Sequence, residues 1–365
     1  MRARALSTRL VRRCQRAANL VYPLKTQTVF ARCPREPARL KGEAHMLRDE
    51  MITVFGGSGF IGRYAVRALV KAGYRVRVAT RLPHTAIDLK PMGSVGQIQL
   101  VQANVRNKAS IERAIEGASA VINLTGILAQ SGRQTFRSVQ AQGAQSIAQA
   151  AKAAGITRFV QISAIGADAD SKSAYAQTKA AGEKAVMDAI PTATILRPSI
   201  VFGAEDSFFN RFAQMALYTP ALPLIGGGKT VFQPVWAGDV GAAVLAALEN
   251  PAAQGKTYEL GGPARYSFKD VLQYITATIR RPRLLVPVPW LAAYGIGFAG
   301  EIAGALPFVP TVLTRDQVTL LKADNVVAEG APGLAELGIS PASVEAIVPT
   351  YLYRFRQGGQ FAPAE

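Results

Sequence analysis

From residue 51 onward, short apolar runs alternate with longer segments whose apolar residues recur at helical spacing. The first run, at 51–57, ends in glycines, and the segment at 60–74 follows with apolar positions from Ile61 to Ala72 before Gly73 ends it. Further strands are predicted at 75–80, 98–103, 119–126, 157–163 and 193–203, and further helices at 133–155 and 175–189. Strands and helices that alternate in this way predict an α/β fold, a Rossmann-type doubly wound parallel sheet with helices on both faces.

After residue 203 the pattern changes, because prolines become frequent. We therefore expect a Rossmann domain over residues 51–203, to whose sheet later segments return. A smaller C-terminal α/β domain of the substrate-binding type is expected over residues 204–355, followed by a tail at 356–365.

The segment at 284–313 is almost wholly apolar, and Glu301 is its only charge. A membrane-spanning helix needs about 20 unbroken apolar residues. Pro289 and Pro307 interrupt this segment, so a span is not expected. We expect a buried helix of the second domain, and the alternative is a helix that lies on a membrane or in a protein interface.

The first 35 residues are rich in arginine and contain no Asp or Glu. This composition is typical of an organelle transit peptide. Two alternatives remain open: a true start at Met46 or Met51, or a short basic tail. Residues 1–50 are expected to be a disordered leader and are left out of the fold prediction.

Both cysteines, Cys14 and Cys33, lie in that leader, and the chain has only two histidines, His45 and His84. Disulfides, thiol catalysis and cysteine-based metal sites are therefore excluded from the globular part. A histidine-based metal site or a Ser-His-Asp triad is not expected either, so no metal is predicted.

The net charge is +18 for the whole chain, and residues 51–365 hold 30 Lys and Arg against 20 Asp and Glu. This balance predicts an acidic partner, and the candidates are a phosphate-bearing cofactor, anionic lipid or nucleic acid. Nucleic acid is not expected, because no run of basic residues is interleaved with aromatics. The alternative is scattered, solvated charge.

The sequence VFGGSGFIG places Gly56, Gly59 and Gly62 between the first strand and the first helix. In this context the glycines permit a tight turn, close approach of the backbone to a pyrophosphate and close helix packing. The helix N-terminus then offers free N–H groups to the phosphates. The predicted cofactor contacts from this loop are Gly56, Ser58, Gly59, Phe60, Ile61 and Gly62.

The second strand ends at Arg81, where an NAD-binding protein would carry an acidic residue for the ribose hydroxyls. Arginine is a bidentate donor suited to the 2′-phosphate of NADP. We therefore predict NADP(H) in preference to NAD(H), with Arg77 reinforcing Arg81. The alternative for Arg81 is a solvated strand end.

Tyr175 and Lys179 stand one helical turn apart in SAYAQTKAAGE. With this pair, the glycine loop and Arg81, the chain from residue 51 onward resembles the extended and atypical short-chain dehydrogenases/reductases. It resembles most closely the NAD(P)H-binding accessory subunits of complex I, NADH:ubiquinone oxidoreductase. The stretches that carry the resemblance are MITVFGGSGFIGRYAVRALVKAGYRVRVATR, RFVQISAIGAD, SAYAQTKAAGE, ILRPSIVFGAEDSFFNRFA and LTRDQVTLLKADNVV.

The resemblance implies a catalytic set in which Tyr175 is the acid/base and Lys179 lowers its pKa and holds the nicotinamide ribose. A cation beside a phenol favours the phenolate. The superfamily's serine position falls on Ala164, next to Ser163, and its asparagine position falls on Gln140. Two of the four catalytic positions therefore differ from the superfamily's residues. Ser163 could take the place of the missing serine only if its loop shifted by one residue.

Other matching positions follow the predicted strands and are expected to line the cofactor. They are Asn104, Val105, Leu124, Thr125, Gly126, Ser163, Pro198, Ser199 and Ile200, in addition to Tyr175 and Lys179. The alternative for each is ordinary loop or core packing, although ligands of such sheets sit at the carboxyl ends of the strands.

The resemblance implies an accessory subunit that binds NADP(H) tightly and stabilises complex I without turnover. Its partners would be other complex I subunits and anionic lipid, and a homo-oligomer is not expected. The implied location is peripheral on the inner membrane, at the cytoplasmic face of an α-proteobacterium or the matrix face of a mitochondrion. One alternative is an active NADPH-dependent reductase or epimerase that uses Tyr175 on a carbonyl or sugar-nucleotide substrate. Another is a redox-sensing regulator.

Overall fold

The structure is a computed structural model that describes residues 47–304 and 313–361 of the chain. Cys14, Cys33, His45 and all but the last four residues of the predicted leader lie outside the described residues. So do residues 362–365 of the predicted tail and 305–312 of the apolar segment.

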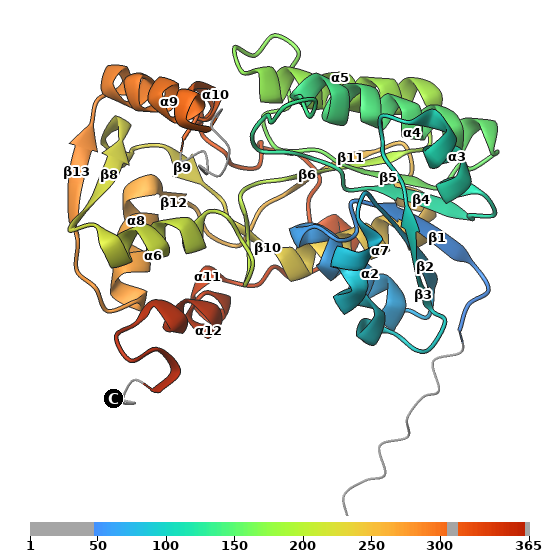
Figure 1. Cartoon of the computed structure of the whole chain (residues 1–365), viewed down its shortest axis with the longest axis horizontal. Helices are drawn as coiled ribbons and strands as arrows, with labels where there is room; N and C mark the ends of the chain where they lie inside the picture. Colours follow the sequence, from blue (N-terminus) through green and yellow to red (C-terminus); the bar gives the residue numbers. More distant parts are fainter. Residues whose placement is uncertain (1–46, 305–312, 362–365) are drawn as a thin grey trace, which may run out of the picture. The chain divides into compact units, whose positions relative to one another are not determined.

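A seven-stranded parallel sheet with the order β11-β6-β5-β4-β1-β2-β3 forms the centre of the fold (Figure 1). Its strands are β1 (Met51–Phe55), β2 (Arg75–Thr80), β3 (Ile98–Gln102), β4 (Ala120–Asn123), β5 (Phe159–Ile162), β6 (Thr194–Pro198) and β11 (Thr257–Leu260). The order reverses beside β1, as in doubly wound folds. The predicted Rossmann-type fold is therefore confirmed.

Helices cover both faces of this sheet. The helices α2 (Phe60–Lys71) and α7 (Ala237–Glu249) pack together on one face, and α3 (Lys108–Ile115), α4 (Gln142–Ala153) and α5 (Ala174–Ala189) cover the other (Figure 1). A short 3-10 segment, η1 (Pro83–Met92), follows β2. Because α7 and β11 follow residue 203 in the chain, later segments do return to the sheet.

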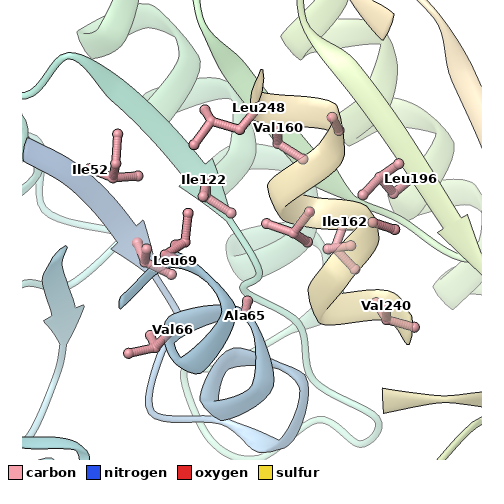
Figure 2. Packing of buried hydrophobic residues seen from close by; sticks show 14 of the residues in the cluster. Ile52, Ala65, Val66, Leu69, Ile122, Val160, Ile162, Leu196, Val240 and Leu248 are labelled. Atoms are coloured by element: carbon pink, nitrogen blue, oxygen red, sulfur yellow. The ribbon is translucent and has the colours of Figure 1, made fainter. Parts of the chain in front are cut away.

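Side chains alternate along the strands between two apolar clusters, as the pleat requires. Ile52, Ile122 and Val160 point to the α2 and α7 side, where Leu69 and Val240 meet them (Figure 2). The neighbouring strand residues face the helices of the other side, and they are Phe55, Ala79, Val121, Phe159 and Ile195. Both faces of the sheet are thus apolar, and this explains the nearly continuous apolar runs in the sequence.

Two predicted elements differ in extent from the structure. The helix expected from residue 133 begins at Phe136, after a turn closed by a Ser131–Gln134 bridge. Its first full turn is a π-helical segment, η2 (Arg137–Ala141). The strand expected at 193–203 is divided into β6 and β7 (Val201–Phe202), because β7 leaves the sheet to pair with β10 (Val235–Trp236).

The C-terminal region has its own aromatic core, in which Phe208, Phe212, Phe232 and Phe268 pack edge to face or tilted. Two further strand pairs frame it, and β8 and β13 lie side by side in Figure 1. The strands are β8 (Ala221–Ile225), β9 (Val231–Phe232), β12 (Tyr266–Ser267) and β13 (Leu284–Val288). The helices are α6 (Phe209–Tyr218), α8 (Phe268–Thr278), α9 (Trp290–Gly304), α10 (Arg315–Leu320), α11 (Val344–Ile347) and α12 (Pro349–Leu352). Short 3-10 turns are η3 (Gly226–Gly228), η4 (Pro251–Ala253), η5 (Ala335–Leu337), η6 (Tyr353–Phe355) and η7 (Gly359–Phe361).

The prediction that residues 284–313 form a buried helix is wrong for the described part. The segment forms β13 and α9, and Leu284 is 72% exposed and Leu291 86% exposed. Only one side of α9 meets the aromatic core, through Ala293 and its neighbours, so the opposite side stays in solvent. Within residues 47–304 and 313–361, no helix has the length and hydropathy that a membrane span requires.

Candidate cofactor site

The loop between β1 and α2 has a path that only glycines can follow. Gly56 has a φ of +76°, and a Cβ there would lie 2.9 Å from the carbonyl carbon of Leu124. A Cβ on Gly62 would lie 2.3 Å from the carbonyl oxygen of Gly56. The third glycine therefore lets α2 fold back tightly onto the loop itself.

The N-terminus of α2 has no side-chain cap, because the N-cap residue is Gly59. The first N–H groups of a helix have no partner within the helix, and together with the helix dipole they form an anion site. Phe60 and Ile61 begin this helix, and the Ser58 hydroxyl donates to the Thr80 hydroxyl at 3.2 Å. The loop thus presents backbone donors beside the end of β2.

Arg81 lines a cavity of about 310 Å³ at the carboxyl ends of β2 and β3. Arg113 of α3 lines the same cavity, together with Asn104 and Asn107, and no acidic side chain is part of its lining. Arg77 does not reinforce this pair. Its guanidinium donates to the carbonyls of Ala114 at 3.0 Å and Glu116 at 2.6 Å. It therefore binds the C-terminal end of α3, because it lies in mid-strand rather than at the strand end.

The segments after β3 and β4 lie at the carboxyl edge of the sheet. Asn104 accepts from the Arg106 N–H at 3.1 Å, and Val105 packs against α4 at Gly143. Leu124 and Thr125 follow β4. The N–H of Leu124 donates to the carbonyl of Phe55, and the Thr125 hydroxyl donates to the side-chain oxygen of Asn123 at 2.6 Å.

Gly126 and the catalytic lysine position lie close together. A Cβ on Gly126 would lie 3.6 Å from Nζ of Lys179. Lys179 is only 6% exposed, and its Nζ donates to the carbonyl of Ile162 at 3.4 Å. The ends of β4 and β5 therefore converge with α5 around the Lys179 ammonium group.

Tyr175 and Lys179 share one face of α5, as their spacing predicts. Nζ of Lys179 lies 5.8 Å from the centroid of the Tyr175 ring, and the ring packs edge to face on Phe136 at 5.7 Å. Burial raises the pKa of the Tyr175 phenol to about 12, and the nearby Asp316 carboxylate adds to the rise. Burial lowers the pKa of Lys179 to about 8, against the opposing effect of Glu183.

The net shift of the Tyr175 pKa is upward, opposite to the shift that Lys179 was expected to produce. Burial of the phenol and the Asp316 charge both disfavour the phenolate.

Ser163 supplies an observation that points to a ligand. It is 3% exposed, its N–H donates to Leu196 at 2.8 Å, and its hydroxyl has no hydrogen-bond partner among the described residues. A buried polar group without a partner costs about 1–3 kcal/mol. The unpartnered Ser163 hydroxyl follows Ile162, whose carbonyl Lys179 contacts. Together with the glycine loop and the uncapped N-terminus of α2, these groups fit a nicotinamide dinucleotide.

Gln140, at the superfamily's asparagine position, bridges two elements of the site. Its amide donates to the carbonyl of Ile127 at 2.8 Å and accepts from the Thr178 hydroxyl at 2.9 Å. It lies in the π-helical turn η2, and its own carbonyl lies so close to Gly182 that a Cβ there would be 2.7 Å away. Gln140 thus holds the loop after β4 against α5, and turns of this kind are frequent at functional sites.

The residues after β6 are held by a partner that sequence reasoning missed. The Ser199 hydroxyl donates to the Asn325 side chain at 2.7 Å. The backbone carbonyls on either side of Ser199 are also engaged: that of Pro198 accepts from the Ile165 N–H, and that of Ile200 accepts from the Val235 N–H. Asn325, Asp316 and Arg113 all reach the site and were not among the predicted residues. The first two lie in LTRDQVTLLKADNVV, a stretch that carried the family resemblance without an assigned role.

The comparisons with known proteins agree with this geometry. Residues 52–261 match the NAD dependent epimerase/dehydratase family. NADH dehydrogenase (ubiquinone) 1 alpha subcomplex subunit 9 of Mus musculus is 36% identical over 307 residues, which cover 84% of this chain and 80% of the mouse protein. The Arabidopsis thaliana subunit 9 is 35% identical over 314 residues, covering 84% of this chain and 78% of its own.

A solved structure, the Escherichia coli NADPH-dependent quinone oxidoreductase complexed with NADPH, has the same fold. Its TM-score is 0.66 at 20% identity, over 83% of this chain and all of that one. The chain belongs to the NAD dependent epimerase/dehydratase family, that is, to the extended short-chain dehydrogenases/reductases. Within it, the chain is a member of the family of complex I accessory subunits represented by subunit 9.

Proposed function

We propose that this protein is an accessory subunit of respiratory complex I that holds NADP(H) as a retained cofactor and does not turn it over. One contrast supports the proposal: the glycine loop and the buried Ser163 and Lys179 suit a dinucleotide, whereas the reacting end lacks the superfamily's serine and has a tyrosine with a raised pKa. The glycine loop, Ser163 and Lys179 would hold the cofactor. When bound, the cofactor would supply hydride chemistry.

The reacting end has two deficits. Ala164 supplies no hydroxyl where the superfamily's serine would orient a substrate oxygen, and losing such a donor costs about 10²–10³ in rate. Tyr175, whose pKa is raised to about 12, is a poor proton exchanger near neutral pH. Lys179 keeps a role without catalysis, because its ammonium can hold the nicotinamide ribose.

The preference for NADP(H) over NAD(H) is supported by the cavity at Arg81. Two guanidinium groups, Arg81 and Arg113, line it without an acidic side chain. A phosphate monoester is the ligand that such a pair recognises best, through bidentate charge-assisted hydrogen bonds. The ribose 2′-phosphate of NADP(H) meets this requirement and the free hydroxyl of NAD(H) does not.

The proposed partners are other complex I subunits, because the curated relatives are subunits of that assembly. We also propose a lipid contact through the outer side of β13 and α9, whose exposed apolar residues are Leu284, Val286, Leu291, Ile296 and Phe298. At its edge the Lys322 ammonium lies over the rings of Trp290 and Tyr294. An ammonium group over amphipathic aromatic rings, next to exposed apolar side chains, fits an anionic lipid surface. The proposed surface is the cytoplasmic or matrix side of the inner membrane.

Self-association through the paired helices α4 and α5 is not expected. The side chains that line their outer groove are mostly polar or charged, and they include Gln145, Gln149, Lys152, Lys184 and Asp188. A stable homodimer interface needs a more apolar core than this groove offers.

A second candidate function is a working NADPH-dependent reductase, and the orphaned Ser163 hydroxyl near Lys179 favours it. One experiment separates the two candidates: titration of the purified protein with NADPH, followed by NADPH oxidation assays with carbonyl and quinone substrates. We expect tight binding without oxidation. Oxidation that disappears in Tyr175→Phe would establish the reductase instead.

A further inference from the structure

Residues 314–328, named here the C-terminal strap, cross the carboxyl edge of the sheet. Gln317 donates to the carbonyl of Leu128 after β4 at 3.3 Å. Asn325 donates to the carbonyl of Ile165 after β5 at 3.4 Å and accepts from Ser199 after β6 at 2.7 Å. The strap therefore contacts the loops that follow three neighbouring strands, at the edge where ligands of such sheets bind.

Asp316 of the strap caps the helix that carries Tyr175 and Lys179. Its carboxylate accepts from the Ser173 hydroxyl at 2.9 Å, the Ala174 N–H at 2.8 Å and the Tyr175 N–H at 3.4 Å. These donors form the N-terminus of α5, where a negative charge is stabilising. A residue more than 140 positions away thus fixes the start of the cofactor-binding helix.

The other end of the strap reaches the same helix through an ion-pair network. The N–H of Ala328 donates to Glu259 at 2.8 Å, and Glu259 pairs with Arg197 at 3.7 Å. Arg197 in turn holds Glu183 with two hydrogen bonds of 2.9 and 2.6 Å. Glu183 lies one turn beyond Lys179, so both ends of the strap are connected to α5.

We propose that the strap and the cofactor bind cooperatively, and that Asp316 is the positioning residue that couples them. With the strap docked, α5 is fixed and the carboxyl ends of β4, β5 and β6 are crossed by residues 314–328, so the nicotinamide end of the dinucleotide leaves only after the strap detaches. This inference rests on the proposed function, because it takes the bound molecule to be NADP(H). By linkage, a cofactor that binds only the closed form must also stabilise the docked strap.

The test compares the full-length wild type with Asp316→Asn and with Asp188→Asn, a control that removes an exposed carboxylate from the other end of α5. Release of NADPH is timed after a chase with excess NADP⁺, and amide hydrogen exchange is followed with and without NADPH. In the wild type, NADPH should slow exchange across residues 314–328. Asp316→Asn should speed release by about fivefold, which is the typical size of a lost helix cap.

Asp316→Asn should also speed exchange at Ala174 and Tyr175 before any nucleotide is added, and Asp188→Asn should change neither measurement. Unchanged release in Asp316→Asn, or exchange of the strap that NADPH does not slow, overturns the inference and leaves the proposed function standing. A wild type that binds no NADPH overturns both. If Asp316→Asn does not fold, Ser173→Ala removes one of the three donors to the Asp316 carboxylate. It should likewise speed NADPH release and amide exchange at Ala174 and Tyr175.

Discussion

The Lys179 ammonium lies over the face of the Tyr175 ring, 5.8 Å from its centroid, and donates to the Ile162 carbonyl. The side chain is almost fully buried, and burial lowers its pKa to about 8. Because the folded protein binds this proton more weakly than the unfolded chain does, the unfolded chain holds more protons between pH 8 and 10.5. The stability of the nucleotide-free protein should therefore rise with pH across that window.

Replacing this lysine tests that relation. Lys179→Met removes a buried charge whose pKa falls from 10.5 to about 8 on folding. At pH 7 it should therefore raise the free energy of unfolding of the nucleotide-free protein by roughly 3 kcal/mol, since one pKa unit equals about 1.4 kcal/mol. The gain should vanish by about pH 10.5. Denaturant unfolding across this pH range is the measurement. Lys184→Met, at an exposed ion pair on the same helix, should show no such trend, and a loss of stability in Lys179→Met at pH 7 would contradict the account.

Gly62 and Gly295 form a matched pair, since each lies inside a helix. Gly62→Ala places a methyl group 2.3 Å from the Gly56 carbonyl, whereas a methyl group on Gly295 meets nothing within 4 Å. Gly62→Ala should lower stability by about 2–3 kcal/mol through overpacking and weaken NADPH binding at least about tenfold. Gly295→Ala should keep binding and gain up to about 1 kcal/mol from helix propensity. Thermal unfolding and NADPH titration check both, and normal binding by Gly62→Ala would refute the assignment of the loop.

Arg81 should set the choice between cofactors. Arg81→Ala removes charge-assisted hydrogen bonds to the 2′-phosphate, so NADPH affinity should fall about 10–100-fold while NADH affinity stays unchanged. Arg75→Ala, at the opposite end of the same strand, should alter neither affinity. Calorimetric titration with both nucleotides is the measurement. An equal loss for NADH and NADPH would mean that Arg81 does not recognise the phosphate.

Much of this site could be predicted from the sequence, because the signals are local. The positions of Gly56 and Gly62 follow from a strand–loop–helix pattern, and the shared face of Tyr175 and Lys179 follows from helix geometry. The roles of Asp316 and Asn325 could not be predicted, since each contact joins residues more than 120 positions apart. The direction of the Tyr175 pKa shift also depends on burial, which spacing does not specify.

The apolar surface of β13 and α9 gives a prediction about lipid. Leu291→Glu places a negative charge on that surface, so binding to vesicles that contain phosphatidylglycerol should fall by at least about fivefold, through lost burial and charge repulsion. Ile87→Glu puts the same change on an exposed isoleucine of η1 and should leave binding unchanged. Vesicle flotation measures both. Equal binding by the two variants and the wild type would remove lipid as a partner for this surface.

Native purification from membranes of the source organism, followed by nucleotide analysis, tests most directly whether the protein retains NADP(H) as a complex I subunit. The protein should migrate with complex I and carry close to one NADP(H) per chain, and Gly62→Ala should remove the nucleotide. A protein that purifies alone, or that joins the complex without nucleotide, would contradict the proposed function.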